Sequence, residues 1–125
     1  MKVLSMRYAS VLPNAEAMAR FFDALGLPRM PLPDLPDVKW PAGFAGAIFP
    51  AGESWIEIWP QGPEMPVGNM LQIVVDDAEA FAAHAKARGL SPEGPMDAHG
   101  ERIFFLKAPD GTQISFQSKL PETAA

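Results

Sequence analysis

One short run of the sequence combines two large aromatic side chains with a carboxylate. Trp55, Glu57 and Trp59 alternate with two isoleucines. Alternate residues of an extended strand share one face of a sheet, so these three side chains should lie together. Indole rings form flat apolar walls with one N–H donor each, and a carboxylate between them can act as a base or bind a cation. The pattern predicts a face that binds an aromatic or heterocyclic ligand; the alternative is ordinary core packing or a dimer interface.

Other reactive side chains are few. Cysteine is absent, which excludes disulfides, thiolate metal sites and cysteine nucleophiles. The two histidines are His84, within an alanine-rich helical pattern, and His99, within a predicted loop. His99 is a candidate general acid or base, and an exposed loop histidine is the alternative. No Ser-His-Asp spacing, glycine-rich phosphate loop or paired-acid arrangement stands out.

Length and charge restrict the class of protein. The 125 residues fit one domain, and the formal charge of −5 argues against a nucleic-acid-binding surface. No apolar run approaches the roughly 18–20 residues that a transmembrane helix needs. The first seven residues are too polar for a signal peptide, which predicts a cytoplasmic protein without a membrane partner.

Two similar sets of elements must position these side chains. In the first half we expect a strand over 3–12, a helix over 15–25 capped by Asn14, and a hairpin over 44–59. An apolar stripe marks one face of that helix: Met18, Phe21, Phe22 and Leu25. In the second half we expect a strand over 70–75, a helix over 78–88, and strands over 103–107 and 113–118. Either Asp76 or Asp77 can cap the second helix.

The two halves share one spacing. Asp77 lies 63 positions after Asn14, and Gly89 lies 63 positions after Gly26, so the helix starts and helix ends both match. This predicts an α+β fold with a mostly antiparallel sheet made by duplication. We expect a single domain over 1–125. Its parts are module 1 over about 3–60, a proline-rich junction over 60–68, module 2 over about 69–119, and a tail over 120–125. The five prolines of residues 28–41 predict a long loop, either a cover over a site or a plain surface excursion.

Four segments give the chain a family resemblance. They are residues 14–27 (from Asn-Ala-Glu to Leu-Gly-Leu), 75–80 (Val-Asp-Asp-Ala-Glu-Ala), 100–105 (Gly-Glu-Arg-Ile-Phe-Phe) and 108–114 (Ala-Pro-Asp-Gly-Thr-Gln-Ile). With them the chain resembles the vicinal oxygen chelate superfamily, which includes glyoxalases, bleomycin-resistance proteins and extradiol dioxygenases. The resemblance implies two tandem βαβββ modules whose curved sheet forms a cup around a ligand.

The resemblance also implies where a metal would bind. In metal-dependent members, the module-opening strands and the last strand of each module supply four ligands; here these positions hold Arg7, Met70, Glu57 and Ser115. Only Glu57 suits a divalent cation, because Arg7 has no lone pair to donate and Met70 is a soft ligand. We therefore expect no metal and no other cofactor. An ion pair between Arg7 and Glu57 could replace the metal; alternatively Arg7 binds a ligand carboxylate, or Glu57 acts as a base.

The resemblance leads to a hypothesis about function. The expected activity is binding of a small organic molecule in a metal-free cup, by a protein that forms a homodimer; the alternative is a lyase, isomerase or dioxygenase with a diverged site. Glu57 and His99 are the catalytic candidates. A strand shift of two residues would bring Gln72 or Gln117 inward. The predicted ligand-binding residues are Arg7, Trp55, Glu57, Trp59, Met70, Gln72, Ser115 and Gln117.

Overall fold

The computed structural model of the chain describes residues 1–30, 44–63 and 65–121. These residues form two helices and seven strands. Contacts divide them into two compact units: the first unit is Arg7–Asn69, and the second unit is Met1–Met6 together with Met70–Ala125. The sequence hypothesis that residues 28–41 cover a site falls mainly on residues 31–43, outside the described residues.

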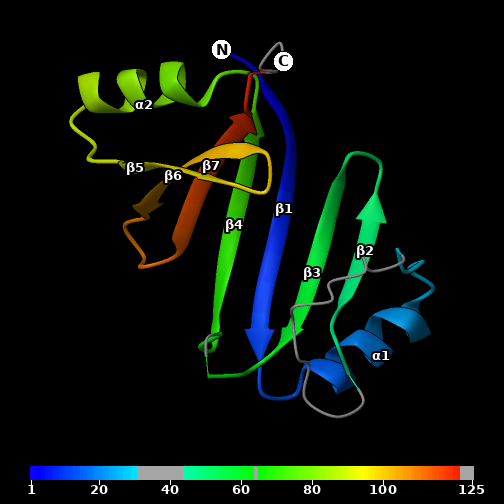
Figure 1. Ribbon diagram of the computed structural model, residues 1–125. Coiled ribbons are helices and arrows are strands. Elements are labelled where there is room, and N and C mark those ends of the chain that lie inside the picture. The colour runs from blue at the N-terminus through cyan, green and yellow to red at the C-terminus, as the bar shows by residue number, and fades with distance from the viewer. Residues whose placement is uncertain (31–43, 64, 122–125) are drawn as a thin grey trace. The chain divides into compact units, whose positions relative to one another are not determined.

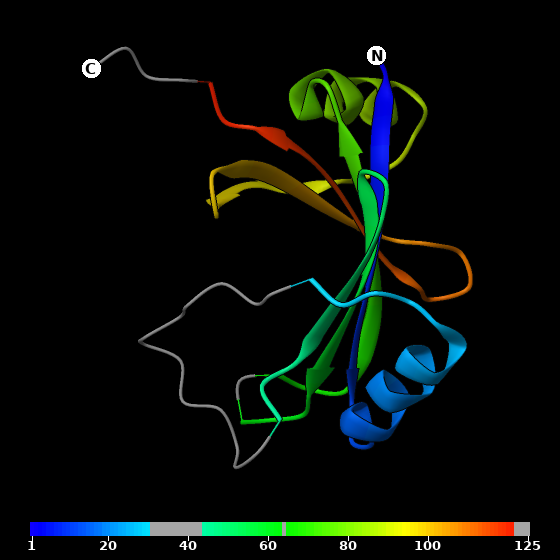
Figure 2. The same ribbon diagram turned by 90° about the vertical axis from the view of Figure 1, so that its right-hand side faces the viewer.

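The first unit contains most of β1 (Val3–Leu12), α1 (Ala15–Leu25), β2 (Ala47–Ala51) and β3 (Ser54–Pro60). Its strands lie in the order β2-β3-β1, with β2 antiparallel and β1 parallel to β3 (Figure 1). Helix α1 lies along one side of these strands (Figure 2). Met30 donates its backbone N–H to Ile48 at 2.7 Å and adds a single antiparallel bridge to β2.

The second unit contains most of β4 (Gly68–Val75), together with α2 (Ala78–Ala87), β5 (Glu93–Ala98), β6 (Glu101–Lys107) and β7 (Gln113–Lys119). Strand β4 pairs in parallel with β7, and β7-β6-β5 continue antiparallel. The predicted α+β fold with a mostly antiparallel sheet is confirmed, and the parallel pairs β1–β3 and β4–β7 make the sheet mixed. Neither helix in the described residues has the length and apolar character needed to cross a bilayer.

The strand register confirms the internal duplication. In the first unit Arg7 lies opposite Trp55, and in the second unit Met70 lies opposite Gln113. The pairing continues in step, so that Ala9 opposite Glu57 corresponds to Gln72 opposite Ser115. Each module therefore begins with a strand that pairs in parallel with the last strand of its own module.

The helix ends follow the sequence in part. Gly26 ends α1 at a φ of 98°, the left-handed conformation that glycine adopts without strain. The Asp77 side chain accepts a hydrogen bond from the backbone N–H of Ala80 at 3.1 Å and caps α2. Asn14 occupies the N-cap position of α1, as predicted, but its side chain makes no capping hydrogen bond. Asp76 instead accepts the backbone N–H of Lys2 at 2.9 Å.

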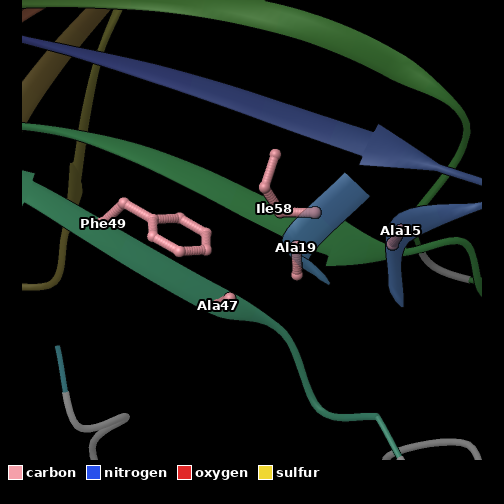
Figure 3. Packing of buried hydrophobic residues seen from close by; sticks show 5 residues of the cluster. All are labelled: Ala15, Ala19, Ala47, Phe49 and Ile58. Atoms are coloured by element: carbon pink, nitrogen blue, oxygen red, sulfur yellow. The ribbon is translucent and has the colours of Figure 1, made fainter. Parts of the chain in front are cut away.

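The core of the first unit lies between α1 and one face of β2 and β3. Figure 3 shows its buried members, which are Ala15, Ala19, Ala47, Phe49 and Ile58. The predicted stripe on α1 is wrong in part, because Met18 and Phe22 pack against this core while Phe21 and Leu25 are 55% and 61% exposed. The small residues Ala15 and Ala19 allow the helix to approach the strands closely. The core of the second unit has the same design and consists of Val75, Ala78, Ala82, Phe104 and Phe116.

Candidate functional site

Strand β3 carries the predicted indole–carboxylate pattern on the face opposite its core. Ile56 and Ile58 pack toward α1, so Trp55, Glu57 and Trp59 lie on the other face. All three are half-buried. The expectation that alternation brings these three side chains together is confirmed by their hydrogen bonds.

Glu57 binds both indoles. Trp55 Nε1 donates to Glu57 Oε2 at 2.7 Å, and Trp59 Nε1 donates to Glu57 Oε1 at 2.9 Å. Hydrogen bonds to an ionised acceptor are short and roughly twice as strong as neutral ones. The single carboxylate therefore fixes the edges of two large rings, one on each side of it along the strand.

Gly46 fixes the position of the Trp59 ring. A Cβ atom at residue 46 would lie 2.4 Å from Trp59 Cε3 and 2.6 Å from Cζ3, distances that no side chain could occupy without displacing the indole. The φ of Gly46 is 124°, which also disfavours other residues. The indole of Trp59 thus packs directly on the main chain just before β2.

Arg7 stacks on the other indole. Its guanidinium carbon lies 4.1 Å from the centroid of the Trp55 ring, a cation–π arrangement. The predicted ion pair between Arg7 and Glu57 is wrong: the hydrogen bonds of the Glu57 carboxylate come from the two indoles. The register explains this, because Arg7 lies opposite Trp55, whereas Ala9 lies opposite Glu57.

The equivalent face of the second unit carries a chain of hydrogen bonds that ends at the Glu101 carboxylate. Ser115 Oγ donates to Gln117 Oε1 at 2.8 Å, and Gln117 Nε2 donates to Glu101 Oε1 at 3.2 Å. Ser115 and Gln117 are both buried, and Met70 and Gln72 on β4 are half-buried. The role of these four residues in ligand binding stays a prediction. The Ser115 hydroxyl and the Gln117 amide already have hydrogen-bond partners within the protein.

The four positions at which the family resemblance would place metal ligands hold side chains that suit a divalent cation poorly. The register places Glu57 and Ser115 at corresponding positions, and likewise Arg7 and Met70. A guanidinium and a thioether are poor partners for a divalent cation, Glu57 already holds two indole N–H groups, and Ser115 Oγ donates to Gln117. Within the described residues, no three of the side chains His, Cys, Asp and Glu are grouped as a metal site would require.

The remaining titratable candidates lie elsewhere in the second unit. His99 is exposed in the turn between β5 and β6, with a φ of 53°. Arg102 binds Asp97 at 2.9 Å and Glu79 at 2.6 Å and thereby ties the β5–β6 hairpin to α2. The hydrogen bond from Arg102 holds the pKa of the Asp97 carboxyl below its usual range. These ion pairs are structural and lie on the helix side of the unit.

Sequence reasoning missed Gly46 and Glu101. Gly46 had a signal, because a glycine beside a predicted strand often marks a close approach of backbone to another group. Glu101 had none, since its contact with Gln117 depends on the pairing of β6 with β7.

The sequence matches no protein-family model and no curated protein. Solved structures resemble the fold instead. One is a glyoxalase/bleomycin resistance protein/dioxygenase superfamily member from Vibrio splendidus 12B01, 17% identical, with a TM-score of 0.62 over 94% of this chain and 100% of that one. Another is methylmalonyl-CoA epimerase from Mycobacterium tuberculosis, 16% identical, with a TM-score of 0.61 over 95% of this chain and 88% of that one.

A third similar structure is described as an NAD-dependent benzaldehyde dehydrogenase from Legionella pneumophila. It is 14% identical, with a TM-score of 0.61 over 92% of this chain and 99% of that one. The three descriptions name different activities, so the likeness identifies the architecture and no substrate. The architecture predicted from the sequence is confirmed: the chain has the fold of the glyoxalase/bleomycin resistance/dioxygenase superfamily.

Proposed function

We propose that this protein binds a small organic molecule with a flat ring system on the face of β3 in the first unit. The observation that carries the proposal is the pair of indoles held by Glu57. Large aromatic side chains with restricted motion make strong binding surfaces, because little side-chain entropy is lost when a ligand stacks on them.

The same geometry favours binding over chemistry at Glu57. Each oxygen of its carboxylate already accepts an indole N–H, which orients the group toward Trp55 and Trp59. A general base must instead lie within hydrogen-bonding reach of a substrate proton. Glu57 thus acts by positioning the indoles. We further propose that the site works without a divalent metal, since Arg7, Met70 and Ser115 are unsuitable ligands.

A thermal-shift screen of planar heteroaromatic and cationic aromatic compounds tests the binding proposal. A ligand at 100 times its Kd stabilises the folded protein by about 2.7 kcal/mol, a readily measured rise in melting temperature. We expect Trp59→Leu to abolish the rise for the compounds that bind. Phe21→Leu is the control, because it removes an exposed aromatic from α1 and leaves β3 intact. A broad panel without any shift would refute the proposal.

Metal analysis tests the second part. Protein purified without an affinity tag should contain less than about one tenth equivalent of Ni, Zn, Mn or Fe. Its melting temperature should not change with a chelator. Stoichiometric metal that stabilises the fold would contradict the proposal.

A further inference from the structure

Both hydrogen-bond donors of the paired indoles have the same partner. An indole has one N–H, and in Trp55 and Trp59 that group donates to Glu57 at 2.7 and 2.9 Å. A neutral acceptor on a ligand would have to displace a carboxylate, although a charge-assisted hydrogen bond is roughly twice as strong as a neutral one. It would also leave a half-buried carboxylate oxygen without its donor, which is costly.

The two rings are also held through their faces. Trp59 packs on the backbone of Gly46. The guanidinium carbon of Arg7 lies 4.1 Å from the centroid of the Trp55 ring. Neither indole can therefore rotate its N–H toward a ligand without losing several contacts at once. What these side chains can offer to a ligand is ring surface.

We infer that Glu57 determines the specificity of this face: it engages both indole N–H groups, so that Trp55 and Trp59 select a ligand by a flat ring surface and not by an acceptor atom at the ring edge. The inference rests on the proposed function. It specifies the class of ligand, which is a planar ring system. Acceptor atoms at the edge of that ring system gain no affinity from hydrogen bonds to Trp55 or Trp59.

Two matched probes test it: naphthalene-2-carboxamide and quinoline-3-carboxamide, which differ in one ring nitrogen acceptor. Their Kd values are measured by calorimetry with the full chain. We expect the wild type to bind the quinoline no more tightly than the naphthalene. In Glu57→Ala the freed indole donors should shift the ratio of the two Kd values toward the quinoline by about two- to tenfold, the value of one neutral hydrogen bond.

Controls separate the inference from the proposed function. Glu53→Ala removes an exposed carboxylate from the β2–β3 turn and should leave the ratio unchanged. If Glu57→Ala does not fold, Glu57→Gln takes its place: its one amide oxygen can hold a single indole, so the ratio should shift in the same direction. A wild type that binds neither probe overturns the proposed function, and the inference falls with it. Two results overturn the inference alone. One is a wild type that binds the quinoline more tightly than the naphthalene. The other is a ratio of the two Kd values that stays the same in the Glu57 variants.

A ligand-free measurement examines the hydrogen bonds themselves. In ¹⁵N-labelled protein, the indole N–H signals of Trp55 and Trp59 should exchange slowly with solvent, and Glu57→Gln should make one of them exchange faster. The chain has three tryptophans, so single Trp→Phe variants assign the signals. Two rapidly exchanging signals in the wild type would overturn the inference even if both probes bind.

Discussion

The contact between Gly46 and Trp59 allows a quantitative test of how the indole is positioned. In Gly46→Ala, the new Cβ would lie 2.4 Å from Trp59 Cε3 and 3.2 Å from the Ile58 carbonyl oxygen, both closer than ordinary van der Waals contact. Overpacking of this kind costs about 1–3 kcal/mol, and an unfavourable positive φ costs about 1–2 kcal/mol more. We expect Gly46→Ala to lower the free energy of unfolding by about 2–5 kcal/mol.

Gly52→Ala is the matched control. Gly52 also has a positive φ, 62°, and it lies in the turn between β2 and β3, but a Cβ atom there would meet nothing within 4 Å. Its cost should be the backbone strain alone, about 1–2 kcal/mol. Urea unfolding followed by circular dichroism measures both variants.

A double-mutant cycle isolates the indole. In a Trp59→Ala background the steric part of the Gly46→Ala cost should largely disappear, which gives a coupling energy of about 1–3 kcal/mol between the two positions. If Gly46→Ala lowers the free energy of unfolding equally in both backgrounds, the Trp59 ring is not the group that requires glycine at position 46.

Three further predictions concern the second unit and the helix ends. Asp77→Ala should lower the free energy of unfolding by about 1 kcal/mol, because it removes the side-chain cap of α2. Asn14→Ala should change this free energy by less than about 0.5 kcal/mol, because the Asn14 side chain makes no capping bond. Urea unfolding measures both variants. Ser115→Ala should cost about 1–3 kcal/mol, since it leaves a buried amide oxygen without its donor; an unchanged midpoint would contradict this hydrogen bond. The folded-state pKa of Asp97 lies below the usual 3.8, so its contribution to stability is present above that pH and is lost as the pH falls through the lower value. Asp97→Asn should therefore weaken the acid dependence of the melting temperature below about pH 4, and so should Arg102→Gln; an identical acid profile in the variants would refute the assignment.

The face that each strand residue occupies and the placement of the helices were predictable because they depend on local patterns. Alternation placed Trp55, Glu57 and Trp59 on one face, and Gly26 marked the end of α1. The partner of Glu57 was not predictable in this way. Alternation says which face a side chain occupies, but whether a carboxylate binds Arg7 or two indoles depends on the offset between β1 and β3.

The apolar stripe on α1 failed for a related reason. A periodic pattern shows which residues share a helix face, but the width of the buried part depends on how closely the strands approach. Ala15 and Ala19 bring the helix so near to β2 and β3 that the flank with Phe21 and Leu25 remains outside the contact.

The parallel pairing of β1 with β3 has a consequence for the order of folding. The hairpin β2–β3 joins residues close in sequence, whereas Arg7 pairs with Trp55 only after the chain between them closes a long loop. Loop closure of this length carries an entropic cost that short hairpins avoid, and non-local pairing slows folding. The hydrogen bonds of Glu57 connect residues two positions apart on one strand, so they can form with the hairpin. Stacking of Arg7 on Trp55 must wait for β1, so we expect the binding face to be assembled in two kinetic stages.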